Sequence, residues 1–244
     1  EKTLQNINFA KEKDSIPFAV FKPTGFGRFS LYQKVSEGHS LSEQQQINWN
    51  NVIDRFDIAC KWARDKDVCL LIDAEESWFQ NAIDDLVDEM MAKYNQSQVI
   101  VYNTYQMYRR DKLDYLKTSF EKAQKNNYFL GAKLVRGAYM DKERNYAREN
   151  NLEDPINPDK KTTDKMFNDG IKFCADNLER IGLVCASHNQ KSTLLLAQIV
   201  EDKGIEKQHP HINFCQLLGM SDNITFNLAQ AGFNVAKYLP YGPL

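Results

Sequence analysis

Two cations interrupt a short apolar run in the segment GAKLVRGAYM, residues 131–140. If this segment is a β-strand, its side chains alternate between two faces, so Lys133 shares a face with Val135 and Arg136 lies on the other. A cation on a buried strand needs an anionic or electron-rich partner, because the burial of an unpaired charge is costly. The segment therefore predicts an electrostatic site in which Lys133 faces such a partner.

Polar or charged side chains also end the other apolar segments of the chain. These segments close at Lys22, at Asp73, at Asn103, at Ser187–His188–Asn189, at Gln216 and at Tyr238. In a parallel α/β barrel, functional residues gather at the carboxyl ends of the strands. The shared pattern is more informative than any single residue, because each of them alone has an ordinary structural explanation.

The apolar segments alternate with stretches of helical periodicity, which is typical of parallel α/β sheets. Their nearly continuous apolar character fits a sheet that is buried on both faces. A doubly wound open sheet is the rival architecture, but GFGRFS (25–30) lacks the third glycine of its phosphate-binding loop. We therefore expect a TIM-type (βα)8 barrel. The predicted strands span residues 16–22, 68–75, 99–103, 128–137, 183–189, 211–217 and 233–240.

The seven predicted strands are one fewer than the eight that close such a barrel. An open barrel leaves two unpaired sheet edges, which proteins normally avoid. We therefore expect residues 1–244 to form one incomplete barrel domain, which lacks the first strand and the final helix of a longer protein.

The composition argues against several classes of function. The formal net charge of −2 does not suggest a surface that binds nucleic acid. No apolar run approaches the ~20 residues that cross a membrane. The five cysteines include no CxxC spacing, and His209 and His211 have no evident third ligand, so we predict reduced thiols and no metal site.

Six segments in order along the chain resemble those of the proline dehydrogenase family, namely FKPTG, LLIDAEES, GAKLVRGAYM, ASHN, QLLGMSD and KYLPYGP. The resemblance covers essentially the whole chain, and DAEES and KLVRGAYM are highly specific in combination. It implies a flavin-dependent, distorted TIM barrel that oxidises L-proline to Δ1-pyrroline-5-carboxylate. The implied hydride acceptor is FAD and the implied electron acceptor is a quinone. The motif variants look more like the single-function branch of the family.

The resemblance assigns catalytic and substrate-binding roles to four residues. Lys133 matches a cation beside the reactive flavin nitrogen, where a fixed positive charge favours the reduced flavin. Asp73 matches an active-site aspartate, and we expect it to pair with Lys22, which matches a lysine beside the proline site. Tyr238 matches a tyrosine that walls the proline ring and resembles proline rather than hydroxyproline specificity.

The resemblance also implies where the cofactor binds. Asn103 falls where relatives often have a glutamine that contacts the isoalloxazine ring, and Ala74 matches a backbone contact. Arg136 begins the segment that matches the binding site for the flavin phosphates and ribityl chain, and Gly137 suits a close backbone approach. The expected cofactor-binding residues are Ala74, Asn103, Lys133, Arg136, Gly137, Ala138, Ser187 and His188.

In the family, a pair of arginines in the helix after the last strand grips the proline carboxylate. This chain ends before that helix, so we expect residues 1–244 alone to bind the substrate weakly. Any peripheral membrane contact is expected from segments outside the chain. The expected location is the cytoplasm or membrane periphery in a bacterium, and the matrix side in mitochondria.

Two other functions remain open from the sequence. A Schiff-base lyase on the same barrel would use Lys22 or Lys133 as its nucleophile, with a pKa lowered by burial. The third hypothesis is a fragment that binds flavin without turnover, because the helix with the arginine pair is missing from the chain. A carbonyl adduct trapped by borohydride would support the lyase, whereas a yellow protein that L-proline bleaches would support the flavoenzyme.

Overall fold

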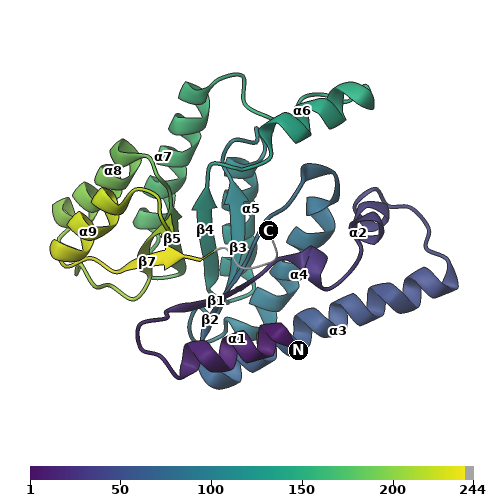
Figure 1. The fold of residues 1–244 in the computed structure, drawn as a ribbon, viewed down its shortest axis with the longest axis horizontal. Coiled ribbons are helices and arrows are strands. Elements are labelled where there is room, and N and C mark those ends of the chain that lie inside the picture. The colour runs from purple at the N-terminus through teal and green to yellow at the C-terminus, as the bar shows by residue number, and fades with distance from the viewer. Residues whose placement is uncertain (240–244) are drawn as a thin grey trace.

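The computed structural model describes residues 1–239, in which seven parallel strands form one sheet. The strands follow one another in chain order from β1 to β7, as in the wall of a βα barrel. Helices surround the curled sheet on its outer side (Figure 1). The strands are β1 (Phe18–Phe21), β2 (Cys69–Ile72), β3 (Val101–Gln106), β4 (Leu130–Val135), β5 (Ile181–Ala186), β6 (Ile212–Leu217) and β7 (Val235–Tyr238).

At least one α-helix follows each strand from β1 to β6. The longest helix, α3, begins with the predicted capping box, in which the Ser42 and Gln45 side chains bond each other's backbone N–H groups. The helices are α1 (Lys2–Lys11), the short 3-10 helix η1 (Pro23–Gly25), α2 (Phe29–Ser36), α3 (Glu43–Lys66), α4 (Ser77–Tyr94), α5 (Lys112–Lys125), α6 (Met140–Glu149), α7 (Lys160–Asp176), α8 (Gln190–Asp202) and α9 (Asp222–Gln230).

The sheet has an apolar core on each of its faces. The larger core includes Leu70, Phe56 and Phe167 and lies between the sheet and its helices. The smaller core includes Leu71 and Tyr102 and lies on the concave side. Consecutive residues of β2 thus enter different cores, because side chains alternate along a strand. The prediction that the sheet is buried on both faces is confirmed.

Each of the seven predicted strands overlaps an observed one, but their ends are shifted. The most consequential shift is in β3, which was expected to end at Asn103 and continues to Gln106. The predicted end of the last strand at residue 240 lies outside the described residues. The idea that a longer protein supplies a further strand and helix stays a prediction.

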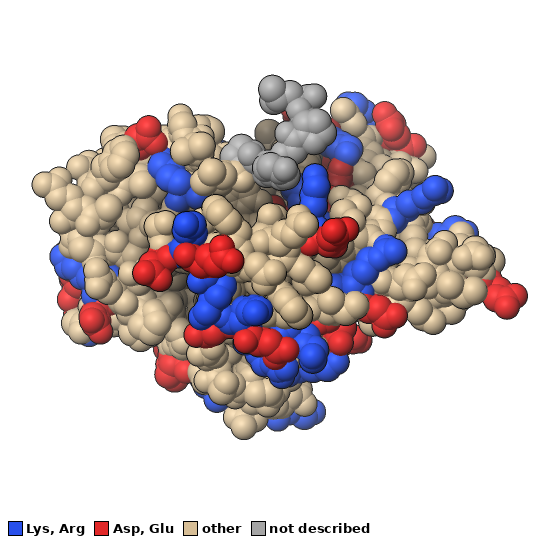
Figure 2. All heavy atoms as spheres, turned by 60° about the horizontal axis from the view of Figure 1, so that its bottom comes forward, with Lys and Arg blue, Asp and Glu red and all other residues tan. Residues whose placement is uncertain are grey.

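Charges of both signs intermingle on the face shown in Figure 2. This mixture accords with the small net charge of −2. Within residues 1–239, no helix is both long and apolar enough to cross a membrane. In the same residues, no group of three or more His, Cys, Asp and Glu side chains is arranged to hold a metal ion.

Candidate active site

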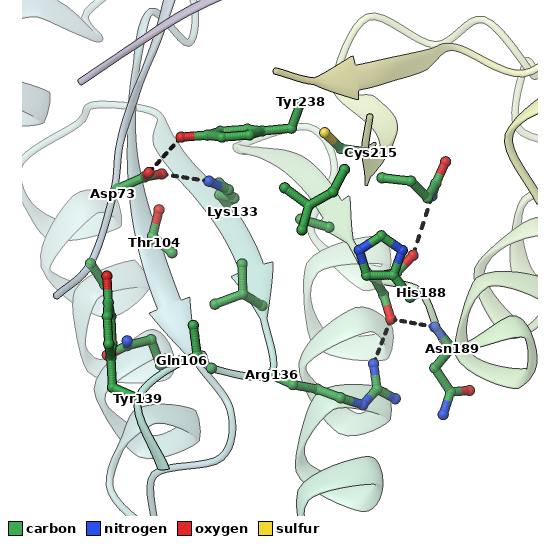
Figure 3. Close-up of a pocket in the computed structure, with 18 of the residues that line it drawn as sticks. Asp73, Thr104, Gln106, Lys133, Arg136, Tyr139, His188, Asn189, Cys215 and Tyr238 are labelled. Atoms are coloured by element: carbon green, nitrogen blue, oxygen red, sulfur yellow. Dashed lines mark hydrogen bonds and ion pairs between the residues drawn. The ribbon is translucent and has the colours of Figure 1, made fainter. Parts of the chain in front are cut away.

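A cavity of about 620 Å³ opens at the carboxyl ends of the strands, on the concave side of the sheet (Figure 3). Its size is that of a pocket for a small ligand or a cofactor. The loops after β1, β2, β4 and β5 contribute to its walls, together with β6 and β7. The expected site residues that line it are Lys22, Asp73, Ala74, Lys133, Arg136, Gly137, Ala138, Ser187, His188 and Tyr238.

Asp73 stands at the centre of a charged cluster in this cavity. Its Oδ1 accepts a hydrogen bond from Lys133 Nζ at 2.6 Å, and its Oδ2 accepts one from the Tyr238 hydroxyl at 2.6 Å. Lys22 Nζ lies 3.7 Å from Oδ2, which confirms the predicted pairing of Lys22 with Asp73. Because Lys133 and Tyr238 lie in β4 and β7, and Lys22 and Asp73 directly follow β1 and β2, the cluster also shows how far the sheet curls.

The cluster keeps its members in defined protonation states. Burial raises the pKa of Asp73, but the neighbouring Lys133, Tyr238 and Lys22 outweigh burial and lower the pKa below its usual value. Burial lowers the pKa of Lys22, but Asp73 and Tyr139 outweigh it and raise that pKa. A lysine whose ammonium form is favoured is a poor nucleophile, so the geometry disfavours a Schiff-base lyase that uses Lys22.

Lys133 points into the cavity from the middle of the barrel wall. In Figure 3 its side chain extends toward Asp73 and Tyr238, and its Nζ lies 4.7 Å from the centroid of the Tyr238 ring. Val135 also lines the cavity, whereas Leu134 belongs to the core under the helices. The predicted alternation of faces is therefore confirmed from Lys133 to Val135, whereas the prediction that Arg136 lies on the opposite face from Lys133 is wrong, because Arg136 also lines the cavity.

Arg136 reaches the cavity because β4 ends one residue before it. Its guanidinium donates hydrogen bonds to Asp164 at 2.9 Å, to the Ser187 hydroxyl at 2.5 Å and to the Ser192 hydroxyl at 2.9 Å. These partners belong to α7, to the loop after β5 and to α8. Arg136 thus lies beside Ser187, which brings together two segments that the resemblance assigned separately to the cofactor, and its orientation is fixed by the protein.

Gly137 has a backbone conformation that only glycine adopts readily, with φ of +139°. A Cβ atom at this position would come within 2.4 Å of the Tyr108 ring. The close approach predicted here is therefore made to Tyr108 within the protein itself. The glycine allows the chain to turn from β4 into the loop that carries Ala138 and Tyr139.

His188 lies at the exposed margin of the cavity. Its Nδ1 is 3.0 Å from the Ser221 hydroxyl, and burial together with Lys237 lowers its pKa. The imidazole is therefore neutral near pH 7 and can exchange donor and acceptor roles with a ligand. The Ser187 hydroxyl beside it accepts a hydrogen bond from the Asn189 backbone at 3.0 Å.

The structure places one expected residue outside the cavity. Asn103 is fully buried, and its side chain donates a hydrogen bond to Asp84 of α4 at 3.0 Å. Because β3 extends to Gln106, alternation directs Thr104 and Gln106 into the cavity and Asn103 toward the helices. The prediction that the Asn103 side chain contacts the flavin in this cavity is therefore wrong.

Sequence reasoning missed several polar groups that line the cavity, among them Gln106 and Tyr139. Gln106 is buried, and its Oε1 has no hydrogen-bond partner among the described residues. Tyr139, which was read as simple barrel packing, accepts a hydrogen bond from Lys22 at 3.2 Å. Continued alternation through residues 102, 104 and 106 is the signal that would have found Gln106.

The fold resembles solved structures of larger proteins. Proline utilization A from Bdellovibrio bacteriovorus, inactivated by N-propargylglycine, superimposes with a TM-score of 0.85 at 20% identity, over 100% of this chain and 26% of that one. A mutant, D779Y, of the Bradyrhizobium japonicum protein gives a TM-score of 0.82 at 18% identity, over 98% and 24%. The similarity confirms an incomplete TIM-type barrel.

The family model described as proline dehydrogenase matches residues 2–244. Proline dehydrogenase 1, mitochondrial, of Drosophila melanogaster is 42% identical over 84% of this chain, and its human counterpart is 37% identical over 84%. Carbapenem antibiotics biosynthesis protein CarD of Pectobacterium carotovorum is 35% identical over the whole chain. The chain spans 31%, 34% and 62% of the lengths of these three relatives, respectively. Because the family model covers nearly every residue, the chain belongs to the proline dehydrogenase family.

Proposed function

We propose that the protein oxidises L-proline to Δ1-pyrroline-5-carboxylate on bound FAD, the first step of proline catabolism. The observation that carries this proposal is the buried Lys133 ammonium, which Asp73 holds at 2.6 Å on the wall of a cavity of about 620 Å³. The fly and human relatives are named proline dehydrogenases, and this name is our reason for proposing L-proline as the substrate of the cavity.

The residues of the cavity fit a flavin. Gln106 Oε1 is a buried acceptor without a partner among the described residues, and it is suited to a ring N–H donor. Lys133 supplies an ammonium donor on the neighbouring strand, opposite Thr104, two residues before Gln106. Arg136 and Ser187 supply donors for phosphate oxygens at another part of the wall. We assign Ala74, Ala138 and His188 to the remaining walls of the cofactor site.

Bound FAD would supply the acceptor for the hydride that leaves proline. The fixed charge of Lys133 would stabilise the negative charge that develops on that acceptor, without any reorganisation of the protein. Asp73 orients Lys133 and holds Lys22 within 3.7 Å, so it positions both cations that face the substrate. Tyr238 would wall the substrate ring, and its hydroxyl is already engaged by Asp73.

The cavity favours electrostatic over acid–base chemistry. Among the described residues that line it, Asp73 is the one carboxylate, and its lowered pKa makes it a poor proton acceptor. We propose that the amine of proline loses its proton to solvent before hydride leaves, because His188, the neutral imidazole of the cavity, lies at its exposed margin and away from Asp73 and Lys133. We expect kcat/KM for L-proline to rise with pH, because the neutral amine becomes more abundant.

The electron acceptor and the location are further parts of this proposal. We infer that a quinone reoxidises the flavin. The fly and human relatives are named mitochondrial, so we infer the matrix side for a eukaryotic source and the cytoplasm or membrane periphery for a bacterial one.

The test is spectroscopic, on the protein in its full natural length. We expect the purified protein to show a flavin spectrum and anaerobic L-proline to bleach it, with 4-hydroxyproline as the control that Tyr238 should exclude. Borohydride treatment with a carbonyl substrate should leave no adduct on Lys22 or Lys133. A folded, colourless protein that does not take up FAD would contradict the proposal.

A further inference from the structure

Three loops that line the cavity are joined to one another by buried carboxylates. The loops follow β1, β2 and β4, and they carry Lys22, Asp73 and Tyr139, respectively. Strand pairing fixes only the starting points of these loops, because each of the three residues lies beyond the end of its strand. Contacts between the loops therefore decide how the three side chains lie relative to one another.

We call each carboxylate that hydrogen-bonds a residue of another loop a joint. Glu143, in the first turn of α6, makes the first joint. Its side chain is buried, with a residue exposure of 1%. It accepts hydrogen bonds from the Ser77 backbone N–H at 2.7 Å and from the Ser77 hydroxyl. Ser77 begins α4, and the N-cap residue Glu76 makes no side-chain cap hydrogen bond. A carboxylate from another element thus caps α4, where free N–H groups and the helix dipole favour negative charge.

Glu75 makes the second joint in the same way. Its carboxylate accepts hydrogen bonds from the Thr24 backbone N–H at 2.9 Å and from the Thr24 hydroxyl at 2.7 Å. Thr24 lies in η1, the 3-10 helix that begins directly after Lys22. The backbone N–H of Glu75 is itself held by the Gln80 side chain at 2.7 Å. The two joints therefore run in series, from the loop after β4 to the loop after β2 and on to the loop after β1.

Glu143 is one helical turn away from a residue that lines the cavity. Its backbone N–H donates to the Tyr139 carbonyl at 2.8 Å. The Tyr139 hydroxyl accepts a hydrogen bond from Lys22 at 3.2 Å, and Lys22 in turn pairs with Asp73. A movement of α6 away from Ser77 would therefore separate Tyr139 from Lys22 and Asp73 together.

The contacts around Glu143 strengthen this attachment of α6. Lys142 pairs with Glu76, and the Tyr146 ring stacks on Trp78 with centroids 3.9 Å apart. Burial raises the pKa of Glu143, while its hydrogen bonds to Ser77 oppose that shift. The first two turns of α6 are thus fixed to the start of α4.

We propose that Glu143 is a positioning residue for proline oxidation, an inference that rests on the function proposed above. By holding Ser77, it fixes the loop of Tyr139 against the loop of Asp73, so that both side chains meet the substrate in one arrangement. A displacement of ~1 Å at such a site costs about 100-fold in rate. Lys133 lies inside β4 and not in the loop that Glu143 holds, so its effect on the flavin should be preserved when the contact between Glu143 and Ser77 is removed.

The first experiment compares Glu143→Ala, Glu143→Gln and Glu149→Ala in the full natural protein with FAD bound. Glu149 is the matched control, because it is an exposed glutamate on the last turn of the same helix. We expect Glu143→Ala to lower kcat for L-proline about 100-fold, with the FAD content and flavin reduction potential unchanged. Glu143→Gln keeps one acceptor oxygen for Ser77 and should recover most of the rate, and Glu149→Ala should leave it intact.

A double-mutant cycle separates positioning from a general loss of structure. Tyr139→Phe removes the hydroxyl that Lys22 contacts, so adding Glu143→Ala to it should cost much less than Glu143→Ala costs alone. Additive effects of the two changes would overturn the proposal. So would a Glu143→Ala variant that turns over L-proline as fast as Glu149→Ala.

Hydrogen exchange gives a readout that does not need turnover. In Glu143→Ala we expect faster amide exchange in residues 73–80 and also in residues 22–26, because the joints act in series. Unchanged protection of both segments would overturn the inference even in a protein that oxidises proline. An FAD-loaded wild-type protein that is inert toward L-proline would instead contradict the proposed function, without any change in this protection.

Discussion

Two buried lysine–aspartate pairs lie on opposite sides of the same sheet. Lys133 and Asp73 face the cavity on the concave side, whereas Lys112 and Asp84 lie on the outer side, where α4 and α5 cover β3. All four residues are buried. The chemical groups are the same in the two pairs, so any difference in their roles must come from what surrounds them.

The carboxylate of the outer pair is enclosed by the protein and has several donors. Asp84 accepts hydrogen bonds from Lys112, from Gln80 at 2.9 Å and from Asn103 at 3.0 Å. The Lys112 ammonium also lies 4.3 Å from the centroid of the Tyr115 ring. A buried carboxylate with this many donors needs no further partner, so the pair joins α4, α5 and β3 as part of the structure.

The inner pair has capacity left for a ligand. An ammonium has three donors, and among residues 1–239 Lys133 and Lys112 each have one hydrogen-bonded acceptor, Asp73 and Asp84, so the difference lies in the space around them. The cavity lies directly in front of Lys133. The comparison teaches that burial and ion pairing do not by themselves mark a functional lysine. What marks a functional lysine is an adjoining cavity in which its free donors can reach a ligand.

Removing the outer lysine should give the largest effect, and it should be on stability. Lys112→Met leaves Asp84 buried without its cation, which we expect to lower the free energy of unfolding by about 3–5 kcal/mol. The matched control is Lys117→Met, an exposed lysine on the same helix. Urea unfolding measures both variants. A loss below about 1 kcal/mol in Lys112→Met, within the range of an exposed ion pair, would show that the outer pair is not structural.

Removing the inner lysine should instead impair turnover. Lys133→Met removes a fixed charge at the reacting centre, and we expect kcat for L-proline to fall by about 10²–10³-fold. The loss of stability should be smaller than in Lys112→Met, because Asp73 keeps Tyr238 and Lys22 as partners. Steady-state kinetics measures the fall in kcat, and urea unfolding measures the loss of stability.

The control for the inner lysine is Lys133→Arg, which keeps the charge and should keep most of the turnover. Stability in acid gives an independent check, because the pKa of Asp73 is lowered in the folded state. Such a group contributes stability that is present above its unfolded pKa of about 3.9 and is lost as the pH falls through the folded pKa. In Lys133→Met the folded pKa of Asp73 rises, so this contribution should shrink. Wild-type turnover in Lys133→Met would contradict the assignment.

The fold was largely predictable because its strands and helices have different hydrophobic periods. The seven strands, the barrel class and the capping box at Ser42 all follow from local patterns. α6 was not predicted, because its sequence MDKERNYARE is polar and only Ala147 and Glu143 are buried. Its position depends on contacts with distant residues such as Ser77, which no local pattern records.

The candidate site was predictable where a strand pattern was unambiguous. Alternation placed Lys133 on the inner face, and the strand-end rule brought Lys22, Asp73 and Tyr238 to one cavity. It failed for Asn103, because the apolar run VIVY stops before β3 does. The hydrogen bonds that continue β3 to Gln106 are made by its neighbour β4, so the end of the strand is set by pairing rather than by its own sequence.

The smallest expected effect tests that correction on two residues of one strand. Asn103→Ala removes one donor to Asp84, so we expect it to lower the free energy of unfolding by about 1.5–3 kcal/mol and to leave the flavin spectrum unchanged. Gln106→Ala removes an acceptor that faces the cavity. It should shift the flavin absorption and weaken FAD binding by up to about tenfold, with little change in stability. Absorption spectra and FAD titrations distinguish the two. If Asn103→Ala shifts the spectrum and Gln106→Ala does not, the inner and outer faces of β3 have been assigned the wrong way round.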